Sequence, residues 1–175
     1  MARILPVEVE NADARVKKEF EDQIRKNGRI TNMKRTLLHS LPSFHALMEW
    51  YPLRDELLKF IGEREFDIFA HTISTENDCI VCSVFFRKVL VDSGDNPDEL
   101  RLSDREQALV DFGSRCVHDP HSVDDELYGR LKSFFSDAQI VALTAFAGLM
   151  IATNLINTAL RVDLDDYLVS YAKGR

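Results

Sequence analysis

The chain has 175 residues, of which 45% are hydrophobic, and its 29 acidic and 22 basic residues give a net charge of −7. This length and composition are typical of one domain with a sizeable core, and no linker rich in proline, glycine or serine divides the sequence. Lysine and arginine are scattered rather than clustered, which argues against the basic footprint of a nucleic-acid-binding protein. We therefore expect a single domain over residues 1–175.

The segment from Met1 to Pro6 is followed at once by acidic residues and lacks the apolar stretch of a secretory signal. We therefore expect a cytoplasmic protein. The longest apolar run, residues 140–153, is interrupted by Asn154 and Asn157 and is too short to span a bilayer. It predicts a buried core helix and no membrane segment.

The hydrophobic periodicity is helical almost throughout, and alternating runs of β-branched residues are missing. The sequence therefore predicts an all-α protein. Gly28, Pro42, Pro52 and Gly62 are expected to separate helices. The predicted helices cover residues 13–27, 33–39, 43–51, 53–60, 63–74, 76–92, 104–117 and 137–160, with a shorter one opening near residue 122.

Capping boxes mark several of these helix starts. In such a box, a serine or threonine is followed three residues later by an acidic or amide side chain. The boxes are Ser103 with Glu106, Ser136 with Gln139, and Ser122 with Asp125. They predict that each of these serines caps a helix.

Cys79 and Cys82 form a C-x-x-C motif, and the i, i+3 spacing puts both sulfurs on one face of a helix. Thr75 with Asp78 resembles a capping box, which predicts Cys79 in the first turn of the following helix. The helix dipole there lowers a thiol pKa, whereas the neighbouring carboxylates raise it. Such a pair can close into a reversible disulfide, so redox chemistry is the first hypothesis.

A reactive thiol also needs a proton acceptor. The position one helical turn after Cys82 is Phe86, which cannot relay a proton. Asp67 and His71 are i, i+4 partners on the preceding helix and could face the cysteines, and an imidazole titrates near neutrality. His71 and Asp67 are therefore the candidate bases.

Two other interpretations of the cysteines stay open. Both thiols can be small apolar groups that fill a helix interface. Alternatively, Cys116, His118 and His121 form a C-x-H-x-x-H cluster that could complete a zinc site with the C-x-x-C motif. We favour a solvated loop for the two histidines, because these groups come from separate elements, and we expect no metal and no cofactor.

Three further segments accompany the C-x-x-C motif: LSDREQAL at residues 102–109, FSDAQIVALT at 135–144 and NLINTALRVDLD at 154–165. In this combination, residues 31–167 resemble the AhpD-like alkylhydroperoxidase and carboxymuconolactone decarboxylase family. The resemblance implies an AhpD-like helical bundle that assembles as a homo-oligomer. It also implies an N-terminal helical extension over about 1–62 and a cysteine-bearing core over about 63–162.

In the redox branch of that family, a glutamate is followed after eleven residues by C-x-x-C and then, after three more, by a histidine. This pattern implies that Cys82 attacks peroxide and passes through a sulfenic acid, while Cys79 is the resolving thiol. The glutamate position falls on Asp67, a shorter carboxylate, and the histidine position falls on Phe86. The resemblance therefore implies peroxidase chemistry with an altered proton relay.

We expect a thiol-dependent peroxidase with Cys82, Cys79, His71 and Asp67 as its site residues. Its substrate would be a peroxide or another small molecule, and an external dithiol of protein or lipoyl type would reduce it. A cofactor-free lyase like the decarboxylase branch is less well supported, because this chain keeps the C-x-x-C motif. A non-catalytic disulfide-relay or oligomeric protein also stays open.

Overall fold

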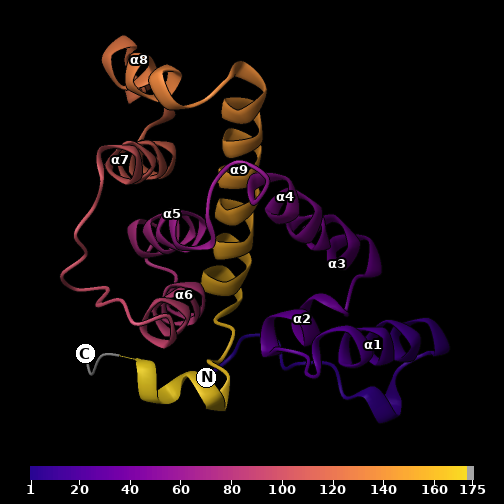
Figure 1. Ribbon diagram of the computed structural model, residues 1–175. Coiled ribbons are helices and arrows are strands. Elements are labelled where there is room, and N and C mark those ends of the chain that lie inside the picture. Colours follow the sequence, from indigo (N-terminus) through magenta and orange to yellow (C-terminus); the bar gives the residue numbers. More distant parts are fainter. Residues whose placement is uncertain (173–175) are drawn as a thin grey trace.

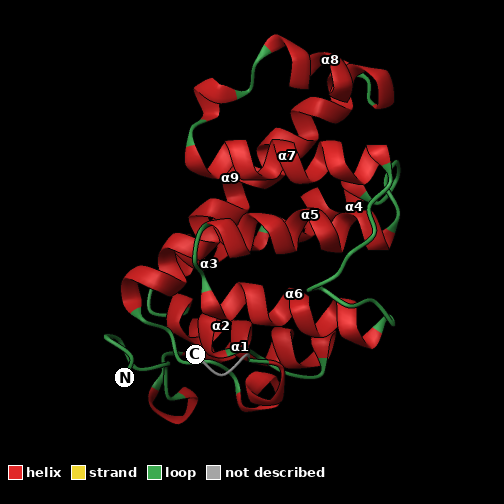
Figure 2. Cartoon of the chain, turned by 90° about the vertical axis from the view of Figure 1, so that its left-hand side faces the viewer, coloured by secondary structure: helices red, strands yellow, loops and turns green. Residues whose placement is uncertain are grey.

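The computed structural model describes residues 1–172, and this part of the chain contains nine α-helices, three short 3₁₀ helices and no strand (Figure 2). The all-α prediction is confirmed. The α-helices are α1 (Ala14–Asn27), α2 (Asn32–Leu37), α3 (Leu41–Met48), α4 (Trp50–Leu57), α5 (Glu63–Glu76), α6 (Ile80–Asp92), α7 (Asp104–His118), α8 (Asp125–Phe134) and α9 (Asp137–Leu160). The 3₁₀ helices are η1 (Val9–Asn11), η2 (Pro120–Ser122) and η3 (Asp166–Tyr171).

The long helix α9 runs through the middle of the molecule. In Figure 1, α5, α6 and α7 are stacked on one side of it, and α3 and α4 lie on the other. Helix α5 packs against α6, α7 and α9, while α4 packs against α9 from the opposite side. The C-terminal η3 lies against α6. The start of α6 lies beside the C-terminal end of α9, where Asn157 contacts Cys82.

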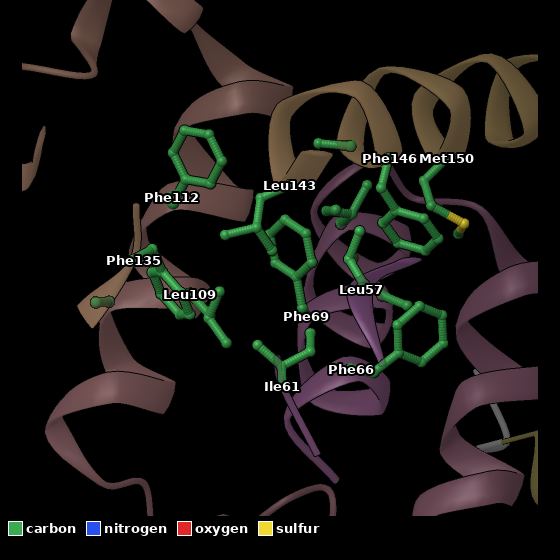
Figure 3. Close-up of a cluster of buried hydrophobic side chains, with 14 of the residues drawn as sticks. Leu57, Ile61, Phe66, Phe69, Leu109, Phe112, Phe135, Leu143, Phe146 and Met150 are labelled. Atoms are coloured by element: carbon green, nitrogen blue, oxygen red, sulfur yellow. The ribbon is translucent and has the colours of Figure 1, made fainter. Parts of the chain in front are cut away.

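The main hydrophobic core lies where α5, α7 and α9 meet (Figure 3). Phe66 and Phe69 of α5 face Phe146 of α9, with ring centroids 5.0 Å and 6.0 Å apart. Phe112 of α7 stacks on Phe69 at 6.2 Å. All four rings are buried, and burying one such side chain contributes about 1.5–3 kcal/mol. This packing holds α5, the helix that leads into the cysteines, firmly against α9.

The predicted capping boxes have different outcomes. Ser103 and Ser136 cap α7 and α9, and both boxes form as predicted. The box of Ser122 with Asp125 is wrong, because Asp124 caps α8. Ser122 is already the last residue of η2 and cannot open the next helix.

The sequence predicted a break between α3 and α4 at Pro52, but the break falls at Glu49. Pro52 lies in the first turn of α4, where a missing N–H group removes no intrahelical hydrogen bond. Trp50 therefore opens α4. Its indole Nε1–H donates to the sulfur of Met150 on α9 at 2.9 Å, which fixes the tryptophan between the two helices.

Within the described residues, α9 is the one helix long and apolar enough to cross a membrane, by length and composition only. It is longer than the apolar run in the sequence, because Asn154 and Asn157 are inside the helix and are 0% and 2% exposed. One face packs into the core, as predicted. The other face is open to solvent in a single chain, with Val141 and Leu155 exposed.

Candidate active site

The turn between α5 and α6 positions the two cysteines. Helix α5 continues through Thr75, and Asp78 then adopts a left-handed conformation with a φ of 48°. The Cys79 N–H donates to the Ser74 carbonyl and the Asp78 N–H donates to the Thr75 carbonyl, both at 3.0 Å, which are the two bonds of a Schellman motif. The predicted capping box of Thr75 with Asp78 is therefore wrong, because both residues terminate α5 instead of opening α6.

Cys79 and Cys82 stand at the start of α6. The sequence had indicated that Cys79 lies in the first turn of α6, but Cys79 is the N-cap residue. Cys82 lies in the first turn. Both thiols are free, and the two residues are 1% and 7% exposed. Their sulfurs are close enough to share a hydrogen bond, in keeping with the i, i+3 spacing.

The last turn of α9 supplies polar groups to this pair. Asn157 Nδ2 donates to Cys82 Sγ at 3.2 Å, and both side chains are buried. The Thr158 side chain lies close to Cys79 and lowers the pKa of its thiol. Asn157 Oδ1 is buried and has no hydrogen-bond partner within residues 1–172. A buried amide oxygen without a partner costs free energy, so this side chain is held beside the sulfur at the expense of stability.

The two sulfurs differ in acidity. The pKa of Cys79 is lowered to about 7, chiefly because the Cys82 thiol donates a hydrogen bond to it, and this effect outweighs burial. The pKa of Cys82 is raised well above its usual value, because its proton is bonded to Cys79 and because it is buried. Around pH 7 a form in which the pair shares one proton and one negative charge is therefore populated.

Cys82 lies in the wall of a cavity of about 510 Å³, and Cys79 does not. The cavity is bounded by α2, α3, α4, α6, α9 and the η3 segment. Trp50, Tyr51 and Phe85 give it a largely aromatic wall. Its size is typical of a site for a small organic molecule. A molecule inside it would lie next to Cys82 and not next to Cys79.

Asp67 lines a different, smaller cavity of about 190 Å³ and not the one that Cys82 lines. Phe85 and Phe86 line both cavities and so stand between them. Burial raises the pKa of Asp67 to about 6, although the charge of Arg54 acts in the opposite direction. The buried Phe86 ring therefore separates this carboxyl from the large cavity.

His71 lies one turn after Asp67 on α5 and is half-buried. It lines neither of the two cavities. The pKa of Cys82 responds to Cys79, to burial and to Asn157. The roles of His71 and Asp67 as bases remain predictions.

The segment around Cys116 is separate from the cysteine pair. Burial raises the pKa of the Cys116 thiol to about 11, which keeps it protonated and unreactive. His118 Nε2 lies 2.6 Å from a carboxylate oxygen of Glu76. Across residues 1–172, no group of three or more histidine, cysteine, aspartate or glutamate side chains is arranged to hold a metal ion.

Two polar residues of the site were missed from the sequence. Asn157 stands three residues after Asn154 in an otherwise apolar helix, and such buried amides need partners, so the pattern was a usable signal. Lys34 also lines the large cavity and is 5% exposed. Nothing in its local sequence indicates burial, which results from the packing of α2 against distant parts of the chain.

No protein-family model and no curated protein sequence matches this chain. Solved structures do resemble it. The alkylhydroperoxidase AhpD core of an uncharacterized peroxidase-related protein from Ralstonia eutropha JMP134 aligns with a TM-score of 0.77 and 18% identity, over 95% of this chain and 94% of that one. The debrominase Bmp8 aligns with a TM-score of 0.78 and 16% identity, over 96% of this chain and 95% of that one.

A cysteine-to-alanine variant of Bmp8, in complex with 2,3,4-tribromopyrrole, aligns with a TM-score of 0.78 and 15% identity, over 96% of this chain and 94% of that one. The alignments cover nearly the whole length of both partners, so the likeness extends to the complete arrangement of helices. At these identities it concerns the fold and not the activity. The chain has the AhpD-like fold.

Proposed function

We propose that this protein is a dithiol reductase that reduces organic hydroperoxides through Cys82 and Cys79. One observation carries the proposal: Cys82 lines a cavity of about 510 Å³, while its hydrogen-bonded neighbour Cys79 is shielded behind it. A pair that already shares one negative charge near pH 7 has the nucleophile that the chemistry needs.

In the first step, the Cys82 sulfur attacks the terminal oxygen of the hydroperoxide. The O–O bond breaks, its electron pair goes to the alkoxide oxygen, and that oxygen takes a proton to form an alcohol. The sulfur becomes a sulfenic acid. Cys79 then attacks this sulfur, the S–O bond breaks, and the hydroxide leaves as water after taking a proton. The peroxide gains two electrons, and the dithiol loses two as it becomes a disulfide.

The proton on Cys82 must leave before attack, and Phe86 cannot take it. The nearest acceptor is the Cys79 thiolate, to which the Cys82 thiol already donates. Transfer along this hydrogen bond puts the negative charge on the sulfur that faces the cavity. His71 and Asp67 remain candidates for receiving the proton afterwards.

A second candidate function is reductive dehalogenation. The cavity is far larger than a small peroxide requires, and a debrominase shares the fold, with a brominated pyrrole bound to its cysteine-to-alanine variant. In this reaction the Cys82 sulfur attacks a ring halogen, and the electron pair of the carbon–halogen bond stays on the carbon, which takes a proton. Cys79 then displaces halide from Cys82 to form the same disulfide.

The proposal also includes an external dithiol, of protein or lipoyl type, which reduces the disulfide. It further includes a cytoplasmic location and self-association through the exposed face of α9. The exposed face of α9 is free of charge beyond its first turn and includes Val141 and Leu155, which supports self-association.

The test follows thiol loss and peroxide consumption when reduced protein is mixed with cumene hydroperoxide. We expect Cys82→Ser to abolish the reaction, because the attacking sulfur is gone. Cys79→Ser should lose one thiol per equivalent of peroxide consumed, where the wild type loses two, because the sulfenic acid cannot be resolved. Cys116→Ser is the matched control and should react like the wild type, since that thiol is protonated and remote from the pair.

Bromide release from a polybrominated pyrrole, measured with the same four proteins, distinguishes the second function from the first. Peroxide consumption that is unchanged in both Cys82→Ser and Cys79→Ser contradicts the dithiol mechanism. Turnover of a small carboxylic acid that survives both changes would identify a lyase. A pair that oxidises and reduces but turns over neither substrate would identify a disulfide-relay protein.

A further inference from the structure

We infer that the cavity beside Cys82 binds an aromatic carboxylate, with the carboxylate held by Lys34 and the ring packed against Trp50 and Tyr51. The chemistry performed on such a molecule rests on the proposed function, whereas its binding does not. The inference depends on a buried cation, on the charge of the cavity wall, and on the shape of the cavity.

Lys34 is a buried cation whose partners are neutral. Its side chain is in α2, and the residue is 5% exposed. The ammonium donates to Gln23 Oε1 at 2.7 Å and to Tyr51 Oη at 2.6 Å, and it lies 4.8 Å from the centroid of the Tyr51 ring. An ammonium has three N–H donors, and these contacts use two of them.

Buried lysines are rare unless they are paired, because removing a charge from water is costly. Lys34 takes part in no ion pair within residues 1–172, yet it lines the cavity. An anion bound in the cavity would supply the missing counter-charge. The acceptor groups of Gln23 and Tyr51 hold the ammonium in place for it.

The other charges in the cavity wall favour the same sign of ligand. Arg29, Arg54 and Lys88 also line the cavity, against a single carboxylate, Asp165. Asp165 is already engaged, because it accepts a hydrogen bond at 2.9 Å from a backbone N–H of α2, and burial raises its pKa. Arg54 and Lys88 pair with carboxylates outside the wall, which leaves Lys34 and Arg29 as its cations without an ion pair within residues 1–172.

The rest of the cavity wall favours a ligand that is apolar and aromatic apart from its carboxylate. Trp50, Tyr51, Phe85 and Phe86 present rings to the cavity, and Met33 and Met150 add polarizable thioethers. A volume of about 510 Å³ has room for one or two aromatic rings. The ligand class that satisfies both the rings and Lys34 is an aromatic molecule with one carboxylate.

The test is calorimetric titration of the reduced full-length protein with 4-phenylbutyrate and with its neutral isostere, 4-phenylbutyramide. We expect the wild type to bind the acid about 10- to 100-fold more tightly than the amide, as is usual for a charge-assisted hydrogen bond. Lys34→Met should remove this preference, because it weakens the binding of the acid and leaves the binding of the amide unchanged. Lys88→Met is the matched control, because Lys88 lines the same cavity but is paired with Asp92, and it should keep the preference within twofold.

Lys34→Gln provides a second variant, since it keeps a polar group beside Gln23 and Tyr51 and should lose the preference in the same way. Equal binding of acid and amide by the wild type overturns the inference. A folded Lys34→Met protein that binds the acid and the amide more weakly by the same factor also overturns it. Cys82→Ser should keep the preference for the acid. A wild-type protein that prefers the acid but consumes no peroxide contradicts the proposed function alone.

Discussion

At the scale of single residues, the acidity of the cysteine pair depends on a small number of hydrogen bonds. The amide of Asn157 lowers the pKa of both thiols, and it lies 3.2 Å from the Cys82 sulfur. The amide acts beside two larger influences, the hydrogen bond between the thiols and burial. Asn157 is therefore a positioning residue for the thiolate.

Asn157→Leu should raise the first pKa of the cysteine pair by about one unit and slow alkylation of the pair at pH 7 about five- to tenfold. The side chains are similar in size, and the change also removes the buried oxygen that has no partner, so the cost in stability should be small. The measurement is the pH profile of the alkylation rate, with the modified cysteine identified by mass spectrometry.

Asn154→Leu is the control for this prediction. Asn154 is on the same helix and equally buried, but its amide donates to the Ile73 carbonyl at 3.4 Å and not to a sulfur. Its replacement should leave the alkylation pKa in place. A profile that shifts equally in both variants would mean that general loosening of α9, and not the Asn157 hydrogen bond, controls the thiols.

Asp67 illustrates the opposite relation between burial and charge. Its folded-state pKa of about 6 lies above the usual value of an aspartate, so the folded protein binds this proton more tightly than the unfolded chain does. The stability contributed by the protonated form is fully present below about pH 4 and is lost as the pH rises through about 6. At neutral pH the ionised carboxylate therefore destabilises the fold.

Asp67→Asn should raise the free energy of unfolding at pH 7.5 by about 1–2 kcal/mol, a value reduced from the full pKa shift because the carboxyl is only partly buried. The gain should disappear at pH 4, where the wild-type carboxyl is protonated in the folded state. Urea denaturation at the two pH values measures it, and Asp55→Asn, an exposed carboxylate beside the same Arg54, should show little change at either. A gain that persists at pH 4 would contradict burial of the charge as the cause.

At the scale of secondary-structure elements, α9 has two faces with different roles. Its buried face carries core residues and, at its C-terminal end, the two asparagines. Beyond Asp137 in its first turn, its exposed face carries no charge, and exposed residues lie along one stripe: Val141, Thr144, Ala145, Gly148 and Leu155. An uncharged stripe of this length suits a second copy of the helix.

Gly148→Glu should therefore convert an oligomer into a monomer, as measured by size-exclusion chromatography with light scattering. A side chain at Gly148 meets nothing within 4 Å in the single chain, and glutamate favours a helix more than glycine does, so the monomer itself should not be destabilised. Gly129→Glu on α8 is the control, because that site is equally open and lies on a different helix. A wild-type protein that is monomeric at micromolar concentration would contradict the proposed self-association.

The helix pair that holds the cysteines shows what the sequence could and could not predict. Periodicity identified α5 and α6, since each buries a regular apolar face. The predicted junction between the two helices was wrong, because a threonine and an aspartate at i, i+3 occur both in capping boxes and in Schellman turns. The left-handed backbone of Asp78 distinguishes the two, and it is a conformational fact with no signature in the residue types alone.

At the scale of the whole molecule, the fold was predictable and the cavity was not. An all-α bundle follows from local patterns that each helix carries by itself. The cavity is assembled from α2, α3, α4, α6, α9 and η3, so Lys34, Trp50 and Tyr167 become neighbours only through long-range packing. The proximity of Cys79 and Cys82 was the part of the site that is local in sequence, and it was predicted correctly.

The unequal access to the two sulfurs has a kinetic consequence. Once a disulfide forms, an incoming thiolate can reach the Cys82 sulfur through the cavity, whereas Cys79 is 1% exposed and lies outside the cavity wall. Attack at Cys82 expels Cys79, whose low pKa makes it the better leaving group. In the proposed peroxidase cycle, oxidant and reductant would therefore occupy the same space in turn, which predicts ping-pong kinetics and a preference for a slender dithiol arm over a bulky one.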